Sequence, residues 1–235
     1  MTDTVPFQHE SDRPSTLKVA VVQMNSGDDK GANIDAARDG IDRAAATGAR
    51  LVALPEVWTY LGPVSGNAGA AETIPGPLTD ELAERAREHG IFLHVGSFFE
   101  RVEREQRLYN TSVVFGPDGH EIARYRKIHL FDVDLDSDTA YNESTSVAPG
   151  EEIVTFEIDE IIVGLTICYD LRFPELFRIL ALRGAKVIVL PAAFTLVTGK
   201  DHWEPLIRAR AIENAVYIVA PAQVGQHPPG LWCYG

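Results

Sequence analysis

The amino-acid sequence predicts a four-layer α/β/β/α sandwich made of two similar halves. The main observation is an internal repeat, in which GARLVALPEVW (residues 48–58) and GAKVIVLPAAF (residues 184–194) share Gly-Ala, a basic residue, an apolar run and Leu-Pro. Each copy follows an apolar run and a helical pattern, and precedes a second helical pattern and another apolar run. Strand–helix–strand units build parallel sheets that carry their helices on one side. Two such halves can bury their remaining sheet faces against each other.

The first half begins with an apolar run over residues 17–24 that lacks strict alternation, which is typical of a strand covered on both faces. Residues 30–47 carry apolar side chains at helical spacing, and residues 51–56 are expected to form the next strand. A second helix is expected near residues 78–88, followed by a strand over residues 91–99. The order strand, helix, strand, helix, strand indicates two crossover units.

The second half is expected to repeat this order after a strand pair. The predicted elements are two strands, a helix, a strand, a helix and a strand, at residues 153–158, 161–167, 174–182, 184–191, about 201–213 and 216–223.

The two halves differ after their last repeated strand. In the first half a β-hairpin is predicted over residues 108–115 and 121–126, with the turn Pro117-Asp118-Gly119. The second half ends instead at residues 231–235, so the sequence is expected to stop one hairpin short, as a truncated form of a longer protein would. Residues 1–16 are polar and are expected to form a disordered tail, and residues 17–235 a single domain.

The composition narrows the class of protein. With 45% hydrophobic and 23% charged residues the chain is typical of a globular protein. Its net charge of -13 and the lack of a basic run argue against a nucleic-acid partner. Residues 1–16 lack the apolar segment of a signal peptide, and no apolar stretch reaches the roughly 18–20 residues that span a bilayer. We therefore expect a cytoplasmic protein without a membrane partner.

Cys168 is the first candidate for chemistry. It ends a predicted strand just before a helical pattern, where backbone N–H groups and the positive helix end favour a thiolate. Taken alone, a buried cysteine is more often a small packing residue. Neither Cys168 nor Cys233, the only other cysteine, has zinc-site or disulfide spacing.

Three motifs in order resemble the nitrilase, or carbon–nitrogen hydrolase, superfamily. They are LPE (54–56), YRKIHL (125–130) and TICYDLRFPE (166–175), and the similarity continues through HWE (202–204) and RARAIE (208–213). The resemblance covers residues 17–235 and implies the same four-layer sandwich. It also implies a homo-oligomer, and neither a metal nor a cofactor.

The resemblance places the family's Glu-Lys-Cys triad on Glu56, Lys127 and Cys168. The Cys168 sulfur would attack an amide carbonyl while Glu56 takes the thiol proton, and a thioester would form as ammonia leaves. Lys127 and the backbone N–H of Tyr169 would stabilise the oxyanion. Taken alone, Glu56 is more often a solvated strand-end carboxylate, and Lys127 could equally be a surface charge.

A further acidic residue of the family, which positions the substrate or the lysine, corresponds best to Glu143. Five acidic residues of the same loop also match positions 1, 3, 5, 7 and 12 of a calcium-binding loop: Asp132, Asp134, Asp136, Asp138 and Glu143. Ser137 stands at the sixth position, where the sharp turn needs glycine. A calcium site and a solvated acidic lid are therefore alternatives for this loop.

The substrate is expected to be a small linear carboxamide. The Cys-Tyr-Asp sequence departs from the Cys-Trp-Glu of true nitrilases, and the chain most resembles amidases of deaminated glutathione, then omega-amidases of α-keto acids. Alternatives are an N-carbamoyl amino acid hydrolase and a catalytically silent scaffold.

Arg172 is a candidate to bind a substrate carboxylate, or else to form a salt bridge with Glu175 or Asp170. His202 offers a Cys/His pair as in thiol proteases, or a structural role.

Overall fold

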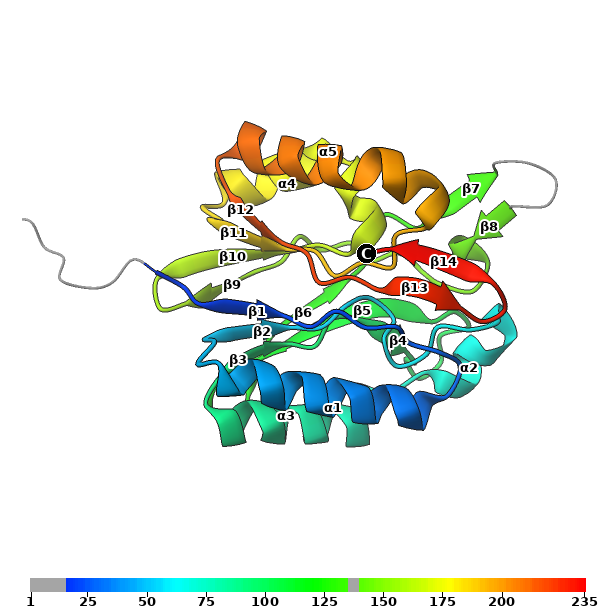
Figure 1. The fold of residues 1–235 in the computed structure, drawn as a ribbon, viewed down its shortest axis with the longest axis horizontal. Helices are drawn as coiled ribbons and strands as arrows, with labels where there is room; N and C mark the ends of the chain where they lie inside the picture. The colour runs from blue at the N-terminus through cyan, green and yellow to red at the C-terminus, as the bar shows by residue number, and fades with distance from the viewer. Residues whose placement is uncertain (1–15, 135–139) are drawn as a thin grey trace, which may run out of the picture.

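The computed structural model describes residues 16–134 and 140–235 and has the predicted four layers (Figure 1). Helices α1 (Lys30–Ala46) and α3 (Pro77–His89) cover one side, and α4 (Pro174–Leu182) and α5 (Leu196–Asn214) cover the other. Two β-sheets lie face to face between these helical layers. The α/β/β/α sandwich predicted from the repeat is confirmed.

The first sheet has the strand order β1-β2-β3-β5-β4, and β6 pairs with β5. Strands β1, β2 and β3 are parallel, as the crossover helices require, whereas β4, β5 and β6 pair antiparallel. Their bounds are β1 Val19–Val21, β2 Leu51–Ala53, β3 Phe92–His94, β4 Phe98–Glu100, β5 Tyr109–Phe115 and β6 Glu121–Arg126.

The second sheet has the order β12-β11-β10-β9, with β10, β11 and β12 parallel. Its strands are β9 Thr155–Ile158, β10 Ile161–Leu165, β11 Val187–Val189 and β12 Tyr217–Val219. Val187 of β11 pairs with β10 and β12 just as Leu51 of β2 pairs with β1 and β3. The sequence repeat therefore corresponds to equivalent positions in the two sheets.

Short elements surround one end of the sandwich. Strands β7 and β8 form one small antiparallel pair, and β13 and β14 form another. The elements not yet given are η1 Val64–Gly66, α2 Asn67–Ala70, β7 Asp132–Asp134, β8 Ala140–Asn142, η2 Glu143–Thr145, η3 Cys168–Arg172, β13 Val224–His227 and β14 Leu231–Tyr234. The tail expected at residues 1–16 lies, except for Thr16, outside the described residues.

The core follows the two-residue period of the central strands. Val52 and Leu54 belong to the apolar cluster that includes Ile41 of α1 and Leu82 of α3. Leu51, one position away, belongs instead to the cluster that contains the apolar residues of the second sheet. Alternate side chains of one strand therefore pack against the helices and against the opposite sheet. Burying each such leucine contributes roughly 1.5–3 kcal/mol.

Two predicted boundaries were wrong. Residues 91–99 form two strands, because Gly96 at φ 66° breaks the run and a Cβ there would collide with the carbonyl of Pro55. The glycine thus lets the chain pass directly behind the end of β2. Helix α5 starts at Leu196, earlier than the expected residue 201. The first turn includes Gly199, which packs so closely on Tyr234 that a larger residue would not fit there.

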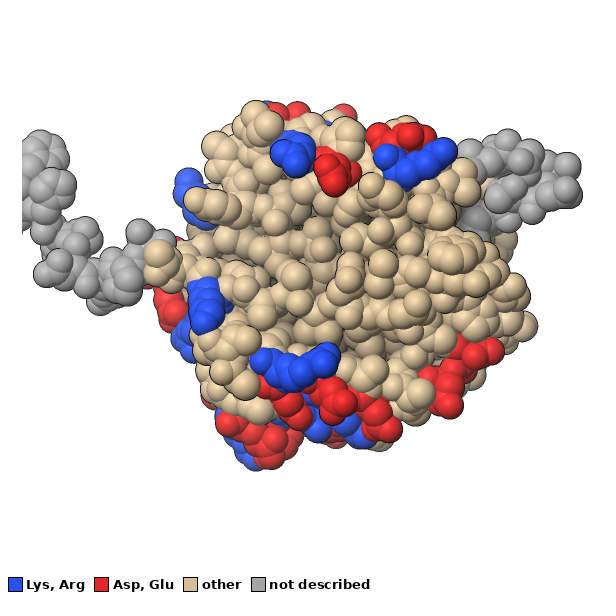
Figure 2. Space-filling model, viewed as in Figure 1, with Lys and Arg blue, Asp and Glu red and all other residues tan. Residues whose placement is uncertain are grey.

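Charged side chains gather over the two helical layers on the face seen in Figure 2, whereas most of the band between them carries neither sign of charge. This distribution agrees with a fold in which sheet residues are buried and helices meet water. Within the described ranges, no helix combines the length and the apolar character that crossing a membrane requires.

Candidate active site

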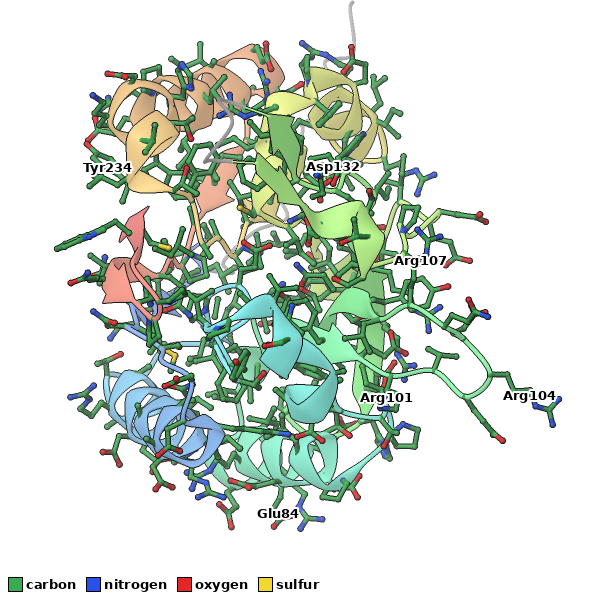
Figure 3. All side chains as sticks on the ribbon, turned by 90° about the vertical axis from the view of Figure 1, so that its right-hand side faces the viewer. Glu84, Arg101, Arg104, Arg107, Asp132 and Tyr234 are labelled. Carbon is green, nitrogen blue, oxygen red and sulfur yellow. The ribbon has the colours of Figure 1, made fainter. Side chains whose placement is uncertain are left out.

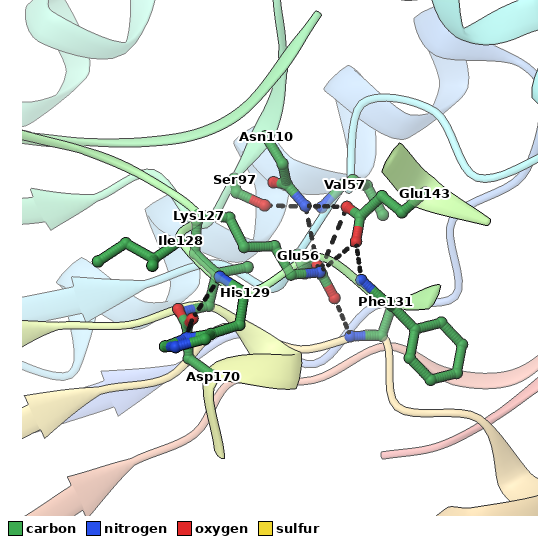
Figure 4. A network of polar contacts seen from close by, with 12 residues as sticks. Glu56, Val57, Ser97, Asn110, Lys127, Ile128, His129, Phe131, Glu143 and Asp170 are labelled. Atoms are coloured by element: carbon green, nitrogen blue, oxygen red, sulfur yellow. Dashed lines mark hydrogen bonds and ion pairs between the residues drawn. The ribbon is translucent and has the colours of Figure 1, made fainter. Parts of the chain in front are cut away.

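Glu56 follows β2 and lies at the junction of the two halves, with only 4% of its surface exposed. Its Oε1 accepts hydrogen bonds from Lys127 Nζ and from Asn110 Nδ2, both at 2.9 Å (Figure 4). Its Oε2 accepts the backbone N–H of Ala193, at 2.8 Å, from the loop after β11. The carboxylate is therefore fixed by donors from both halves, and it is not the solvated strand-end group that was the alternative.

Lys127 follows β6 and is 2% exposed. Besides Glu56, its Nζ donates to Glu143 Oε2 at 3.0 Å. Burial alone would lower the pKa of Lys127, but the carboxylates of Glu143 and Glu56 raise that pKa well above its ordinary value. The lysine is therefore a permanent buried cation, and the surface-charge alternative is wrong.

Glu143 begins η2 and is 7% exposed. In addition to Lys127, its Oε2 accepts the backbone N–H of Phe131 at 2.7 Å. Its Oε1 lies 3.4 Å from Asn110 Nδ2, so this amide reaches both carboxylates. Glu143 is thus the second carboxylate that pairs with Lys127.

The calcium alternative finds no support at the described positions of the loop. Glu143 points at Lys127, and Asp132 Oδ1 accepts the backbone N–H of Ser144 at 3.0 Å. Asp136 and Asp138 lie outside the described residues, as does the side chain of Asp134. Across residues 16–134 and 140–235, no group of three or more acidic, His or Cys side chains could hold a metal ion.

Cys168 follows β10 and opens η3, with φ at 45°. A non-glycine residue in this left-handed region carries strain of about 1–3 kcal/mol. Its backbone N–H donates to the carbonyl of Pro191 at 2.9 Å, which holds the turn. The tight turn points the sulfur toward the junction, where Glu56 and Lys127 act on its pKa.

The helix end that was expected to favour a thiolate does not directly follow Cys168. Residues 168–172 form a short 3-10 helix, and α4 begins only at Pro174. Burial, followed by the charge of Glu56, raises the pKa of the Cys168 thiol well above its ordinary value, although Lys127 opposes them. The resting cysteine is therefore a protonated thiol that needs a base.

Asp170 joins the turn of Cys168 to the segment that carries Lys127. This fully buried carboxylate accepts the hydroxyl of Tyr125 at 2.7 Å and the backbone N–H of Ile167 at 2.7 Å. It also accepts the backbone N–H of His129 at 3.1 Å and contacts that ring's Nδ1 at 2.7 Å (Figure 4). Such a saturated buried carboxylate fixes both segments relative to each other.

Arg172 lies beside this centre. Its guanidinium carbon stands 5.2 Å from the ring centroid of Phe194 and 5.6 Å from that of Tyr169, and its nitrogens are 3.4 Å from His202 Nδ1. Among the ion pairs of the described residues, none joins Arg172 to Glu175 or Asp170, so the salt-bridge alternative is not found. His202 contacts Arg172, which leaves the Cys/His alternative without support.

The backbone N–H of Tyr169 is the donor that was expected to face an oxyanion. In the described part of the chain, its backbone N–H has no backbone acceptor, whereas the next N–H, that of Asp170, donates to Ile167 at 3.0 Å. Tyr169 follows Cys168 in the sequence, and both residues line the same cavity as Lys127.

Five of these residues line a cavity of about 450 Å³ at the end of the sandwich shown in Figure 3: Glu56, Lys127, Glu143, Cys168 and Tyr169. Arg172 and Asp170 are not among its lining residues. Most of the lining is apolar, and its charged members are Glu56, Lys127 and Glu143. The larger apolar and aromatic lining residues are Val57, Tyr60, Leu61, Phe99, Phe131, Val133, Tyr169, Phe194, Leu196, Val197, Leu231 and Trp232. A cavity of this size accommodates a small molecule.

Sequence reasoning missed Asn110 and Asp170 as site residues. Asn110 stands in the largely buried strand β5 and is 2% exposed, with its Oδ1 left without a partner among the described residues. In the sequence, a polar amide side chain within a mostly apolar strand was the signal that could have indicated a site residue. Asp170 was named only as an ion-pair partner for Arg172, whereas its actual donors come from residues far away in the sequence and from the turn itself.

Fold and site together define a family. The chain belongs to the carbon–nitrogen hydrolase family, whose model matches residues 18–235, and the nitrilase resemblance predicted from three motifs is confirmed. It is 43% identical over 204 residues to omega-amidase NIT2 of Homo sapiens, covering 87% of this chain and 73% of the relative. It is 41% identical over 211 residues to deaminated glutathione amidase of Synechocystis, covering 88% and 78%.

A solved structure gives the same fold. The C. elegans NitFhit protein superposes with a TM-score of 0.85 at 36% identity, over 92% of this chain and 53% of that longer chain. The sandwich and the placement of its halves are therefore those of the nitrilase superfamily.

Replacing Lys127 tests the electrostatics of the site. The Lys127→Met variant leaves Glu56 and Glu143 buried without their cation, and we expect it to lower the free energy of unfolding by about 3–5 kcal/mol at pH 7.5. One carboxylate should bind a proton in the folded variant, so the variant should regain stability relative to the wild type as pH falls toward 5.5. Urea unfolding at both pH values measures this.

The double variant Lys127→Met/Glu143→Gln is the matched control, because it removes one of the two stranded charges. It should be more stable than Lys127→Met alone. Equal stability of the two variants, or a loss that does not change with pH, would show that the carboxylates do not depend on the lysine.

Proposed function

We propose that this protein is a cysteine amidase, which hydrolyses a small linear carboxamide to a carboxylic acid and ammonia. The observation that carries the proposal is the convergence of Glu56, Lys127 and Cys168 on one cavity. Membership of the carbon–nitrogen hydrolase family and the two amidase relatives support the same reaction class. The chemistry uses only protein side chains and backbone donors.

In the first step Cys168 Sγ attacks the amide carbonyl carbon while Glu56 accepts the thiol proton. The carbonyl π electrons move to oxygen, and Lys127 Nζ with the Tyr169 N–H stabilises the negative charge, at about 3 kcal/mol for one good donor. Glu56 then returns the proton to the nitrogen, the carbon–nitrogen bond breaks, and ammonia leaves. A thioester on Cys168 remains.

In the second step water attacks the thioester carbonyl, and Glu56 accepts a proton from that water. The oxyanion forms in the same place, collapses, and expels the sulfur, which regains its proton from Glu56. The raised pKa of the Cys168 thiol fits this cycle, because the sulfur is protonated before and after turnover. Glu143 acts through Lys127, which it holds toward the sulfur and Glu56.

The substrate class we propose is a short amide with a carboxylate at its far end, such as deaminated glutathione or the omega-amide of an α-keto acid. The apolar walls of the cavity suit an acyl chain, and Arg172 supplies a cation beside Tyr169 and Phe194. Two relatives are named omega-amidase and deaminated glutathione amidase, which supports this choice.

A homo-oligomer in the cytoplasm is part of the same proposal. Leu182, Ile212 and Tyr217, on α4, α5 and β12, are each at least 77% exposed, which is unusual for large apolar side chains and favours self-association. Sedimentation velocity should give at least twice the 25.8 kDa of one chain, and a monomer at micromolar concentration would contradict it.

The nucleophile and base are tested by replacement. Cys168→Ala should abolish ammonia release from a panel of amides, and Glu56→Gln should slow it by about 10²–10⁴-fold, because proton transfer is lost at both steps. Intact mass spectrometry should detect an acyl adduct on the wild-type protein. The matched control is Cys233→Ala, which changes the other buried cysteine and should stay within twofold of the wild type.

Two results would contradict the assignment. One is undiminished ammonia release by Cys168→Ala. The other is an acyl adduct located on a peptide that does not contain Cys168.

The substrate class is tested with Arg172→Met and a pair of amides that differ only in a terminal carboxylate or methyl group. A charged hydrogen bond contributes about 1.5–3 kcal/mol, so KM for the carboxylate amide should rise by roughly 10- to 100-fold. KM for the methyl analogue should hardly change, and Arg172→Lys should fall between. An equal effect on both amides would rule out carboxylate binding by Arg172.

A further inference from the structure

The peptide between Glu56 and Val57 is strained. Val57 has φ at 43°, in the left-handed region, where a β-branched residue is a clear outlier. This peptide sets the direction in which the Glu56 side chain leaves the end of β2. A strained conformation persists only where its surroundings hold it, so the contacts of this peptide matter for the position of the carboxylate.

Two fully buried side chains hold the peptide from opposite ends. Ser97 Oγ accepts the N–H of Val57 at 3.2 Å (Figure 4), and Gln223 Nε2 donates to the carbonyl of Glu56 at 3.1 Å. These residues come from the β3–β4 connection and from the segment before β13. Each satisfies one polar group of a buried peptide that has no strand partner.

Gln223 is itself fixed on every side. Its Nε2 also donates to Ser26 Oγ at 3.0 Å, and its Oε1 accepts the Ser26 N–H at 3.0 Å. Its backbone N–H donates to Ala192, at 2.9 Å, in the second half. The next residue, Ala193, is the one whose N–H holds Glu56 Oε2. Gln223 therefore links the main chain of Glu56 to the strand end that holds its carboxylate.

We propose that Gln223 is a positioning residue for Glu56, which it aims at the Cys168 thiol by clamping the Glu56–Val57 peptide. The inference rests on the proposed role of Glu56 as the base. A base must lie within about 2.6–3.2 Å of the heavy atom that carries the proton, and an error of about 1 Å can slow a reaction 100-fold. Gln223 touches neither substrate nor sulfur, so its effect passes through Glu56.

The kinetic test is a double-variant cycle. Gln223→Leu should lower kcat by about 10- to 100-fold and leave KM within about threefold, because the cavity wall is unchanged. In the Glu56→Gln background the same change should lower kcat by less than about threefold, since the base is already lost. A general structural defect would lower kcat equally in both backgrounds, and that outcome would overturn the inference.

Gln223→Glu is the conservative variant. Its carboxyl group can still accept the Ser26 N–H, but when ionised it cannot donate to the Glu56 carbonyl. When protonated it can donate, so the ratio of its kcat to that of the wild type should rise as pH falls from 8 to 5.5. A ratio that does not change with pH would count against the clamp.

The control is Asn214→Leu, which removes another buried amide that donates to a backbone carbonyl, that of Arg210 at the far end of α5. It should lower stability as Gln223→Leu does, yet leave kcat unchanged within twofold. If Asn214→Leu slowed turnover as much as Gln223→Leu, the loss would be one of stability and the inference would fail.

A crystal structure of Gln223→Leu separates this inference from the proposed function. We expect Glu56 Oε2 to move out of hydrogen-bonding distance of the Ala193 N–H, which can be seen whether or not any amide is hydrolysed. An unmoved Glu56 would overturn the positioning role even in an active enzyme. A wild-type protein that releases no ammonia, with Glu56 displaced in the variant, would sink the amidase proposal and leave the clamp standing.

Discussion

The buried cation of Lys127 is the constraint on which the site depends. Its ammonium group pairs with two buried carboxylates, those of Glu56 and Glu143, and removing it would leave both charges uncompensated. The three groups arrive from β2, β6 and η2, so the charge balance forms only when those elements are assembled. The carboxylates accept further hydrogen bonds from the Asn110 amide and from the backbone N–H groups of Phe131 and Ala193. The Cys168 thiol is then the uncharged group of the triad.

The fold was largely predictable because its information is local or repeated. Apolar runs, helical periods and the GA-basic-apolar-Leu-Pro repeat required no knowledge of distant contacts. The error at residues 91–99 has a tertiary cause, since nothing near Gly96 in the sequence reports that Pro55 lies behind it. The early start of α5 is similar, because Gly199 weakens the helical pattern but allows Tyr234 to pack closely.

The site was predictable only in part, and for a physical reason. Glu56, Lys127 and Cys168 stand in recognisable motifs, so resemblance located them. Ser97 and Gln223 are ordinary polar residues whose contacts with the Glu56–Val57 peptide span 40 and 167 positions of the chain. The sequence could not fix the pKa of the Cys168 thiol, because burial and a facing carboxylate, which raise it, act only in three dimensions.

The repeat has a consequence for how such a site can arise. The strand registers place Met24 of the first half where the second has Cys168, and Ala192 of the second half where the first has Glu56. Two identical halves would bring together either two thiols and two carboxylates or neither. The thioether of Met24 and the methyl of Ala192 are inert, so each half lacks what the other keeps. The backbone thus repeats between the two halves, whereas the proposed nucleophile and the proposed base each stand in only one of them.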